Sequence, residues 1–238
     1  MCPTNASWPP WRRCFAIVPA QRPERRSIAA SSGYNTSVFI NCPFDDGYLP
    51  VFRALIFTVS HCGLYPRCAQ EIYDAGQVRI EKIVNLIKAC RWGIHDISRT
   101  ELSALGLPRF NMPLELGIFL GAQRFGAGIQ ARKSCIVLDQ DKFRYQAFLS
   151  DIAGQDIAAH GNDPARAIQA VRDWLRSSGA GAPRPAGGAA IARRYMKFIS
   201  ELPELCSAAD ILPDELTFAD YTDIVSTWLK RELGQPIQ

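Results

Sequence analysis

The chain has 238 residues and a formal net charge of +4, with 47% hydrophobic and 21% charged residues. These values are ordinary for a soluble globular protein, and the length suffices for one large domain, or one domain with a small appendage, that buries a core. Much of the excess positive charge lies in the first 30 residues. The nearly neutral remainder argues against a dedicated nucleic-acid groove, which shows as clustered Lys and Arg.

Other classes of protein are disfavoured by the sequence as well. No apolar run approaches the roughly 20 residues that a transmembrane helix needs, so we expect no membrane partner. The eight cysteines form no Cys-x-x-Cys pair and lie mostly in apolar segments, as in a reduced, cytoplasmic protein. The three histidines are far apart and not at metal-ligand spacing, so we expect no metal site.

The predicted elements begin after a segment without pattern. Residues 1–34 mix Pro, Arg and Ser, and we expect a poorly ordered extension there. Residues 35–178 alternate short β-type runs with helical patterns, which is typical of βαβ units and a parallel sheet. The expected strands are 37–42, 64–71, 92–98 and 134–139, and the expected helices are 49–63, 78–90, 112–126 and 163–178.

Local signals support several of these boundaries. Gly63 ends the first expected helix, and Pro66 places the second strand near an edge of the sheet or makes it short. The segment 145–160 is ambiguous and is predicted as a short helix followed by a short edge strand. Asp163 and Pro164 have the residue types of a helix cap and a first helical position.

The composition changes after the α/β region. Residues 179–190 form a Gly/Pro/Ala-rich linker by composition. Residues 191–238 contain two amphipathic helical patterns, whose aromatic residues we expect to pack. We therefore expect a small C-terminal helical appendage, with about five strands in the sheet of the main domain.

Polar residues gather where the expected strands end. Ligands of open α/β sheets bind beyond the carboxyl ends of the strands. The first strand leads into Asp45 and Asp46, and a helix carrying Glu115 follows the third. The third strand itself ends near Asp96, Ser98 and Arg99. The sequence therefore predicts a polar, acid-lined pocket, although acids before Gly47 are also ordinary turn residues.

Several nucleotide-binding and hydrolase motifs are absent. No Gly-x-Gly-x-x-Gly or Walker loop follows the first strand, where "CPFDDGY" has one glycine and two acids. No Gly-x-Ser-x-Gly elbow occurs. Acids at strand ends can accept hydrogen bonds from sugar hydroxyls. A carboxylate beside an anomeric carbon can stabilise or trap an oxocarbenium-like centre.

Glu115 is the one charged residue of the apolar stretch "NMPLELGIFLGA". With Pro113 near the first helical position, Glu115 is expected in the first turn, where the helix N-terminus keeps a carboxylate ionised. Gly117 and Gly121 are expected to let this helix approach the sheet closely. Glu115 is then either a nucleophile or electrostatic stabiliser, or a structural acid that complements the helix dipole.

Three segments together resemble a known superfamily. "VFINCPFDD", the strand end "HDIS" and "NMPLELGIFLGAQRFG...KSCIVLD" resemble the nucleoside 2-deoxyribosyltransferase-like and Toll/interleukin receptor (TIR)-like proteins, which have flavodoxin-like folds. The resemblance covers about 37 to 140. It departs from the family at Met112 and Pro113, where the family has small residues before the acid, and at Cys42, where it has glycine.

The resemblance implies a flavodoxin-like α/β fold and roles for several residues. By this likeness Glu115 is the nucleophile, Asp96 and Ser98 bind ribose hydroxyls, and Phe44 stacks on a base. Substrate binding is also expected to include Asp45, Asp46 and Asn111. Arg79 and Arg99 either hold a pyrophosphate or lie on solvated surfaces.

The function predicted is an N-glycosidase or glycosyl-transfer enzyme that cleaves the base–ribose bond of a nucleotide. NAD is then a substrate rather than a cofactor, and bacterial TIR-like relatives use this reaction in antiphage defence. The alternatives are a non-catalytic TIR-like module that senses a nucleotide or assembles, and a nucleoside deoxyribosyltransferase. Partners are expected to be a nucleotide or nucleoside, and a second copy or another protein through the C-terminal helices.

Overall fold

A parallel sheet forms the centre of the molecule. The computed structural model describes residues 33–71, 76, 78–100, 109–182 and 184–234. Within these residues five parallel strands have the spatial order β2-β1-β3-β4-β5, which is the flavodoxin-like order. The strands are β1 (Ser37–Asn41), β2 (Tyr65–Arg67), β3 (Trp92–Asp96), β4 (Ser134–Asp139) and β5 (Ile157–Ala159).

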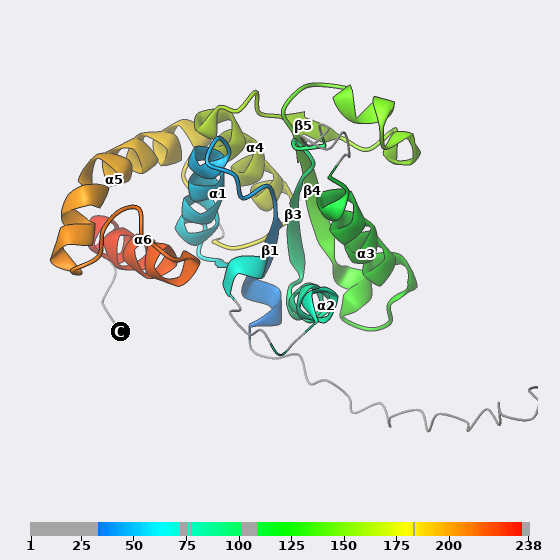
Figure 1. The fold of residues 1–238 in the computed structure, drawn as a ribbon, viewed down its shortest axis with the longest axis horizontal. Coiled ribbons are helices and arrows are strands. Elements are labelled where there is room, and N and C mark those ends of the chain that lie inside the picture. The colour runs from blue at the N-terminus through cyan, green and yellow to red at the C-terminus, as the bar shows by residue number, and fades with distance from the viewer. Residues whose placement is uncertain (1–32, 72–75, 77, 101–108, 183, 235–238) are drawn as a thin grey trace, which may run out of the picture.

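Helices cover both faces of this sheet (Figure 1). One face is covered by α1 (Leu49–His61) and α4 (Pro164–Ser177), and the other by α2 (Arg79–Ala89) and α3 (Asn111–Phe125). The last two described helices, α5 (Gly188–Ala208) and α6 (Phe218–Glu232), pack on the outer side of α4 and α1. The predicted α/β class and flavodoxin-like sheet are confirmed.

Most element boundaries fall near their expected places. The second strand is shorter than predicted, because the chain leaves the sheet after Arg67 and forms a 3₁₀ turn. It lies at the edge, as Pro66 indicated. The Asp163 carboxylate accepts a hydrogen bond from the Ala165 amide at 2.8 Å and caps α4, with Pro164 at its first position. The ambiguous segment contains 3₁₀ turns and then the edge strand β5.

The described chain begins inside the segment expected to be poorly ordered. Residues 1–32 lie outside the described residues. Tyr34 is 2% exposed, and its hydroxyl donates a hydrogen bond to the Ile129 carbonyl at 2.6 Å. Tyr34 therefore anchors the residues just before β1.

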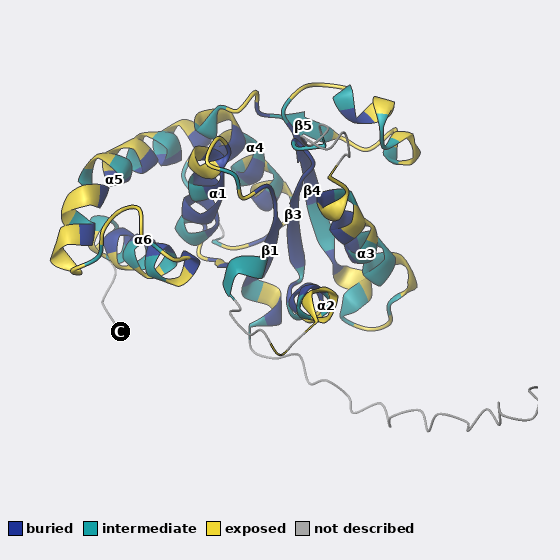
Figure 2. Ribbon diagram, viewed as in Figure 1, coloured by how far each residue is buried: buried dark blue, intermediate teal, exposed yellow. Residues whose placement is uncertain are grey.

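The central strands β1 and β3 are buried on both faces, as expected of a parallel sheet between two layers of helices (Figure 2). Successive side chains of a strand point to opposite faces. Val38 and Ile40 therefore pack towards α1 and α4, while Phe39 packs towards α2 and α3. The same alternation directs Asn41 to the α3 side of the sheet.

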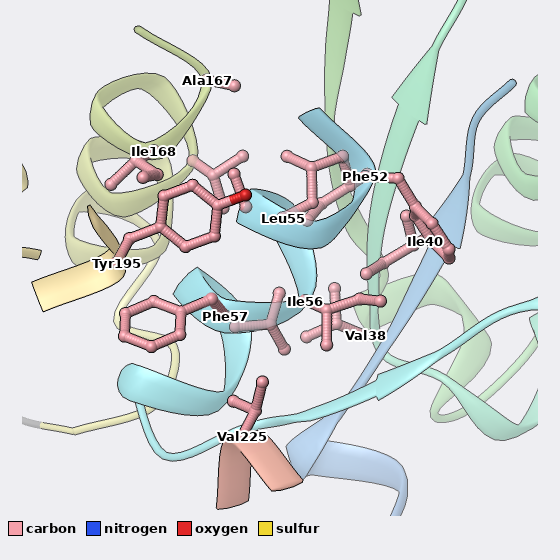
Figure 3. Close-up of a cluster of buried hydrophobic side chains, with 14 of the residues drawn as sticks. Val38, Ile40, Phe52, Leu55, Ile56, Phe57, Ala167, Ile168, Tyr195 and Val225 are labelled. Atoms are coloured by element: carbon pink, nitrogen blue, oxygen red, sulfur yellow. The ribbon is translucent and has the colours of Figure 1, made fainter. Parts of the chain in front are cut away.

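The C-terminal helices share the core of the α/β region. Phe57 points from α1 towards the outer helices and Tyr195 (Figure 3). Its ring centroid is 5.5 Å from that of Tyr195 and 5.8 Å from that of Trp228. Phe198 is fully buried against the same rings. These aromatic residues pack, as predicted. Helix α5 begins at Gly188, inside the range expected to be linker.

Among the helices of the described part of the chain, none combines the length and apolarity needed to cross a membrane.

Candidate functional site

A pocket of about 410 Å³ opens beyond the carboxyl end of β1. Its walls come from the end of β1 and the loop after it, from the first residue of α2 and from the start of α3. β1 and β3 are the neighbours at which the strand order reverses. Ligands of flavodoxin-like folds bind at this switch point, and the volume is within the range of small-molecule sites.

Five of the predicted site residues line this pocket: Phe44, Asp45, Arg79, Asn111 and Glu115. They are far apart in the sequence and meet because β1, α2 and α3 all present the same end of the sheet. A carboxylate in the interior and a guanidinium at the start of α2 make the pocket bipolar, with both hydrogen-bond acceptors and donors for a ligand.

Glu115 is held on the buried face of α3. Met112, Leu116 and Phe119 are the apolar residues of that face, at the helical spacings of three and four residues. The Glu115 side chain is 8% exposed, and no described residue donates a hydrogen bond to its carboxylate. Burial raises the pKa of Glu115 to about 7, which the charge of Arg79 opposes.

The expected position of Glu115 in the first helical turn is wrong. The helix begins at Asn111, so Glu115 is its fifth residue, where the favourable effect of the helix N-terminus has weakened. The expectation that this acid stays firmly ionised is corrected as well, because a pKa of about 7 leaves protonated and ionised forms together at neutral pH.

Helix α3 approaches the sheet closely at Gly93, and not at Gly117 or Gly121 as predicted. A Cβ added at Gly117 or at Gly121 meets nothing within 4 Å. A Cβ at Gly93 of β3 is 2.8 Å from the Phe119 ring and 2.8 Å from His95 Nε2. The missing side chain of Gly93 therefore provides the space into which Phe119 of α3 packs.

The loop after β1 is supported by aromatic packing and an ion pair. Phe44 is 39% exposed, and its ring meets that of Phe52 edge-on with centroids 5.3 Å apart. Phe52 stacks in turn on Phe218 at the start of α6, at 6.2 Å. Arg99 does not line the pocket, but its Nε lies 3.3 Å from Asp45 Oδ2 and so neutralises this wall residue. We name the rings of Phe44, Phe52 and Phe218 the Phe44 stack.

Asp96 and Ser98 lie outside the pocket, in a buried hydrogen-bond network. The Asp96 carboxylate accepts from the Tyr48 hydroxyl at 2.6 Å, the Ser98 amide at 2.8 Å and His160 Nε2 at 2.9 Å. The His160 Nδ1 atom accepts from the Asn162 amide, which places the proton on Nε2. Asp96, Ser98, His160 and Tyr48 are all 0% exposed. The network ties β3 to the start of α1 and to the loop before α4.

The other strand-end acids are also not gathered around the pocket. Asp46 is exposed and is not part of the lining. Asp139 is fully buried and accepts from Arg144 Nη2 at 2.6 Å. Among the described residues, Asp45 and Glu115 are the two carboxylates of the lining. The expected acid-lined pocket is thus corrected to one with a single unpaired acid.

Five lining residues were not predicted: Asn41, Cys42, Pro43, Arg109 and Met112. A polar residue ending the apolar run "SVFIN" was the available signal for Asn41. Burial, followed by the charge of Asp96, raises the pKa of the Cys42 thiol far above its usual value, so this thiol is not a thiolate nucleophile. Of the Cys42 thiol and the Glu115 carboxyl group, the carboxyl group is the one that ionises near neutral pH.

The described residues contain no group of three or more His, Cys, Asp or Glu side chains placed to hold a metal ion. The fold and the pocket together define a flavodoxin-like α/β protein with a pocket at the switch point of its sheet. Comparison with known protein families found no matching family, and comparison with curated proteins found no similar sequence.

Proposed function

We propose that this protein is an N-glycosidase or glycosyl-transfer enzyme acting on a nucleotide, with NAD as the substrate and nicotinamide as the leaving group. The observation that carries the proposal is the Glu115 carboxylate, which lines the pocket, is 8% exposed and has no hydrogen-bond partner among the described residues. A buried acid without a partner is costly for the fold, which makes it a candidate for a working group.

The proposed reaction uses the ionised form of Glu115. As the bond between ribose C1′ and the nicotinamide nitrogen breaks, its electron pair leaves with nicotinamide, which becomes neutral. The carboxylate stabilises the positive sugar centre or bonds to C1′. Water then supplies a hydroxyl to C1′ and releases a proton, or another acceptor completes a transfer. The positive charge of the bound pyridinium ring favours the ionised carboxylate.

The remaining lining residues are proposed to position the nucleotide. Asp45 has acceptor oxygens for ribose hydroxyls, and Phe44 offers a partly exposed ring for stacking on a base. Arg79 and Arg109 are exposed guanidiniums at the pocket, suited to phosphate oxygens. Asp96 and Ser98 have no direct part in this scheme, because both are buried outside the pocket.

The decisive variant is Glu115→Gln, which keeps the shape of the side chain and removes its charge. We expect it to lower nicotinamide release from NAD by about 100-fold or more, because the group that stabilises the sugar centre is lost. Glu81→Gln is the matched control, since Glu81 is an exposed glutamate of α2 outside the pocket lining. Products are separated chromatographically after incubation with NAD, NADP, and purine and pyrimidine nucleosides.

The same incubation separates the alternatives. Undiminished release by Glu115→Gln, or no product from any of these compounds, contradicts the proposal. A nucleotide that raises the melting temperature without being consumed indicates a non-catalytic sensing or assembly module. Exchange of bases between free nucleosides indicates a nucleoside deoxyribosyltransferase.

We also propose, from the resemblance alone, a cytoplasmic role in antiphage defence and association through α5 and α6. Between these helices lies an apolar groove of about 320 Å³ that includes Leu205, Ile224 and Trp228. A mass measurement in solution, with and without NAD, tests whether a second copy binds.

A further inference from the structure

We infer that Asn41 is the specificity-determining hydrogen-bond acceptor of the pocket, and that its Oδ1 atom receives a hydrogen bond from an N–H or O–H group of the ligand. The inference rests on the proposed function in one respect, that the ligand is a nucleotide. It concerns a residue at the end of β1 that lines the same pocket as Glu115 and is 3% exposed.

The orientation of the Asn41 amide is fixed by its neighbours. Its Nδ2 atom lies 2.9 Å from the carbonyl oxygen of Met112 and 3.1 Å from His95 Nδ1. A backbone carbonyl only accepts hydrogen bonds, so the NH₂ group and not the oxygen must face Met112. Rotating the amide by half a turn would set two oxygens against each other, and the buried amide therefore has one orientation.

His95 completes this arrangement as a second acceptor. The amide nitrogen of Asn41 cannot accept, so the contact with His95 Nδ1 requires Nδ1 to be unprotonated. Burial lowers the pKa of His95 to about 3, and nearby Lys133 acts in the same direction, so the ring is neutral at working pH. The ring itself is held between Phe39 and Phe119, with centroid distances of 5.9 Å and 4.8 Å.

Both N–H groups of the Asn41 amide thus donate hydrogen bonds within the protein, while its Oδ1 atom receives none from the described residues. Asn41 as a residue is 3% exposed and lines the pocket, so a partner for its oxygen has to come from the pocket side. A ligand donor seated beside Glu115 supplies that partner without any rearrangement of the protein, which is the condition for selective recognition.

Two parts of a nucleotide carry suitable donors, namely the ribose hydroxyls and the N–H groups of the base. The test uses NAD and three analogues that each lack one donor of the nicotinamide riboside half. These are the 2′-deoxy analogue, the 3′-deoxy analogue and the analogue in which acetyl replaces the carboxamide. All proteins carry Glu115→Gln so that no ligand is consumed, and dissociation constants are measured by calorimetry.

The expected result is a coupling between one ligand donor and Asn41. With Asn41 present, one analogue binds about tenfold more weakly than NAD. With Asn41→Leu, NAD and that analogue bind equally, within about twofold, because the acceptor is gone. General damage to the pocket would instead weaken all four ligands alike. Asn85→Leu, at an exposed asparagine of α2 outside the pocket, is the control and keeps the full discrimination.

The inference is overturned if every analogue binds as NAD does, if the discrimination persists in Asn41→Leu, or if none of the four ligands binds. Should Asn41→Leu not fold, Asn41→Ala replaces it. Should neither fold, a crystal structure of the Glu115→Gln protein with NAD decides, because a ligand N–H or O–H group either lies within hydrogen-bond distance of Asn41 Oδ1 or does not. The coupling is independent of turnover. Coupling without nicotinamide release contradicts only the proposed reaction, and release without coupling contradicts only the role of Asn41.

Discussion

Glu115 is the residue in which the proposed chemistry and the stability of this protein conflict. Its apolar surroundings on α3 raise its pKa from 4.5 to about 7. In the unfolded chain the carboxyl group ionises near 4.5, whereas in the folded chain it stays protonated up to about 7. The folded state therefore loses stability as the pH rises between these two values, and the loss is complete above the folded pKa.

Glu115→Gln is accordingly expected to stabilise the protein at pH 8, by about 3 kcal/mol at most. At pH 5 the gain is expected to be small, because a protonated glutamate and a glutamine differ little. The measurement is urea unfolding of both proteins at the two pH values. An equal difference in unfolding free energy at both pH values would show that the Glu115 carboxyl group titrates normally. Glu81→Gln, at an exposed site, is the reference for a change of charge alone.

The Asp96 carboxylate shows that an acid at a strand end can be structural. Three donors converge on it, from Tyr48, Ser98 and His160. We expect Asp96→Asn to destabilise the protein by about 2–4 kcal/mol, because an amide satisfies these buried donors incompletely. Asp46→Asn, at an exposed acid of the loop after β1, is expected to stay within about 0.5 kcal/mol.

Urea unfolding measures these two effects, and calorimetry with NAD measures binding by the folded Asp96→Asn protein. We expect unchanged affinity, since Asp96 lies outside the pocket lining. A variant that keeps its stability and loses affinity would restore the role in ribose binding that the family resemblance implies.

At the scale of elements, the packing of α3 on β3 depends on one glycine. We expect Gly93→Ala to destabilise the protein by about 1–3 kcal/mol, because the new methyl group meets the Phe119 ring at 2.8 Å. Gly117→Ala is the contrasting variant, since its methyl group meets open space on a helix, and we expect a gain of about 0.5–1 kcal/mol. Urea unfolding again gives both values, and equal effects would mean that α3 is not held through Gly93.

The elements themselves were largely predictable from local pattern. The apolar runs of β1, β3 and β4 and the periodic helices between them are strong signals in the sequence. The faces of the helices are less predictable: Ile80, Ile83 and Ile87 have the spacing of one helical face of α2, but Ile80 is 42% exposed whereas Ile83 and Ile87 are buried. The position of Ile80 in the first turn of α2 lies beyond the reach of the core, which the periodicity alone does not reveal.

The site was predictable only in part, because the sequence does not indicate on which of the two faces of the sheet a pocket opens. Alternation along β3 places His95 on the α3 side and Asp96 on the side of α1 and α4. The strand-end rule identifies the carboxyl ends of the strands, but not the face of the sheet on which a pocket opens. The face on which the pocket opens depends on where α3 begins. The start of α3 at Asn111 determines how deeply Glu115 is buried, and it places the Met112 carbonyl beside the Asn41 amide.

At the scale of the whole molecule, the C-terminal helices and the α/β region share one continuous core. Leu202 of α5 is 4% exposed within it, and we expect Leu202→Ala to cost about 2–5 kcal/mol. Met196→Ala is the control on the same helix, where the side chain is 63% exposed. Urea unfolding is followed by far-ultraviolet circular dichroism and by tryptophan fluorescence, to which Trp92 and Trp174 of the α/β region and Trp228 of α6 contribute.

Because the core is shared, both signals are expected to shift together in Leu202→Ala, as in a single cooperative transition. Two separated transitions, with only the first one displaced, would mean that α5 and α6 fold as an independent appendage.

The Phe44 stack links the pocket to the far end of the described chain. The Phe44 ring packs on Phe52, which in turn packs on Phe218 of α6. A ligand in contact with Phe44 would therefore be supported indirectly by α6. The support behind Phe44 thus includes Phe218, which lies more than a hundred and fifty positions later in the sequence. A chain truncated before Phe218 would lack the outermost ring of the Phe44 stack. The Phe44 ring, on which a ligand ring would stack, would then be less firmly held.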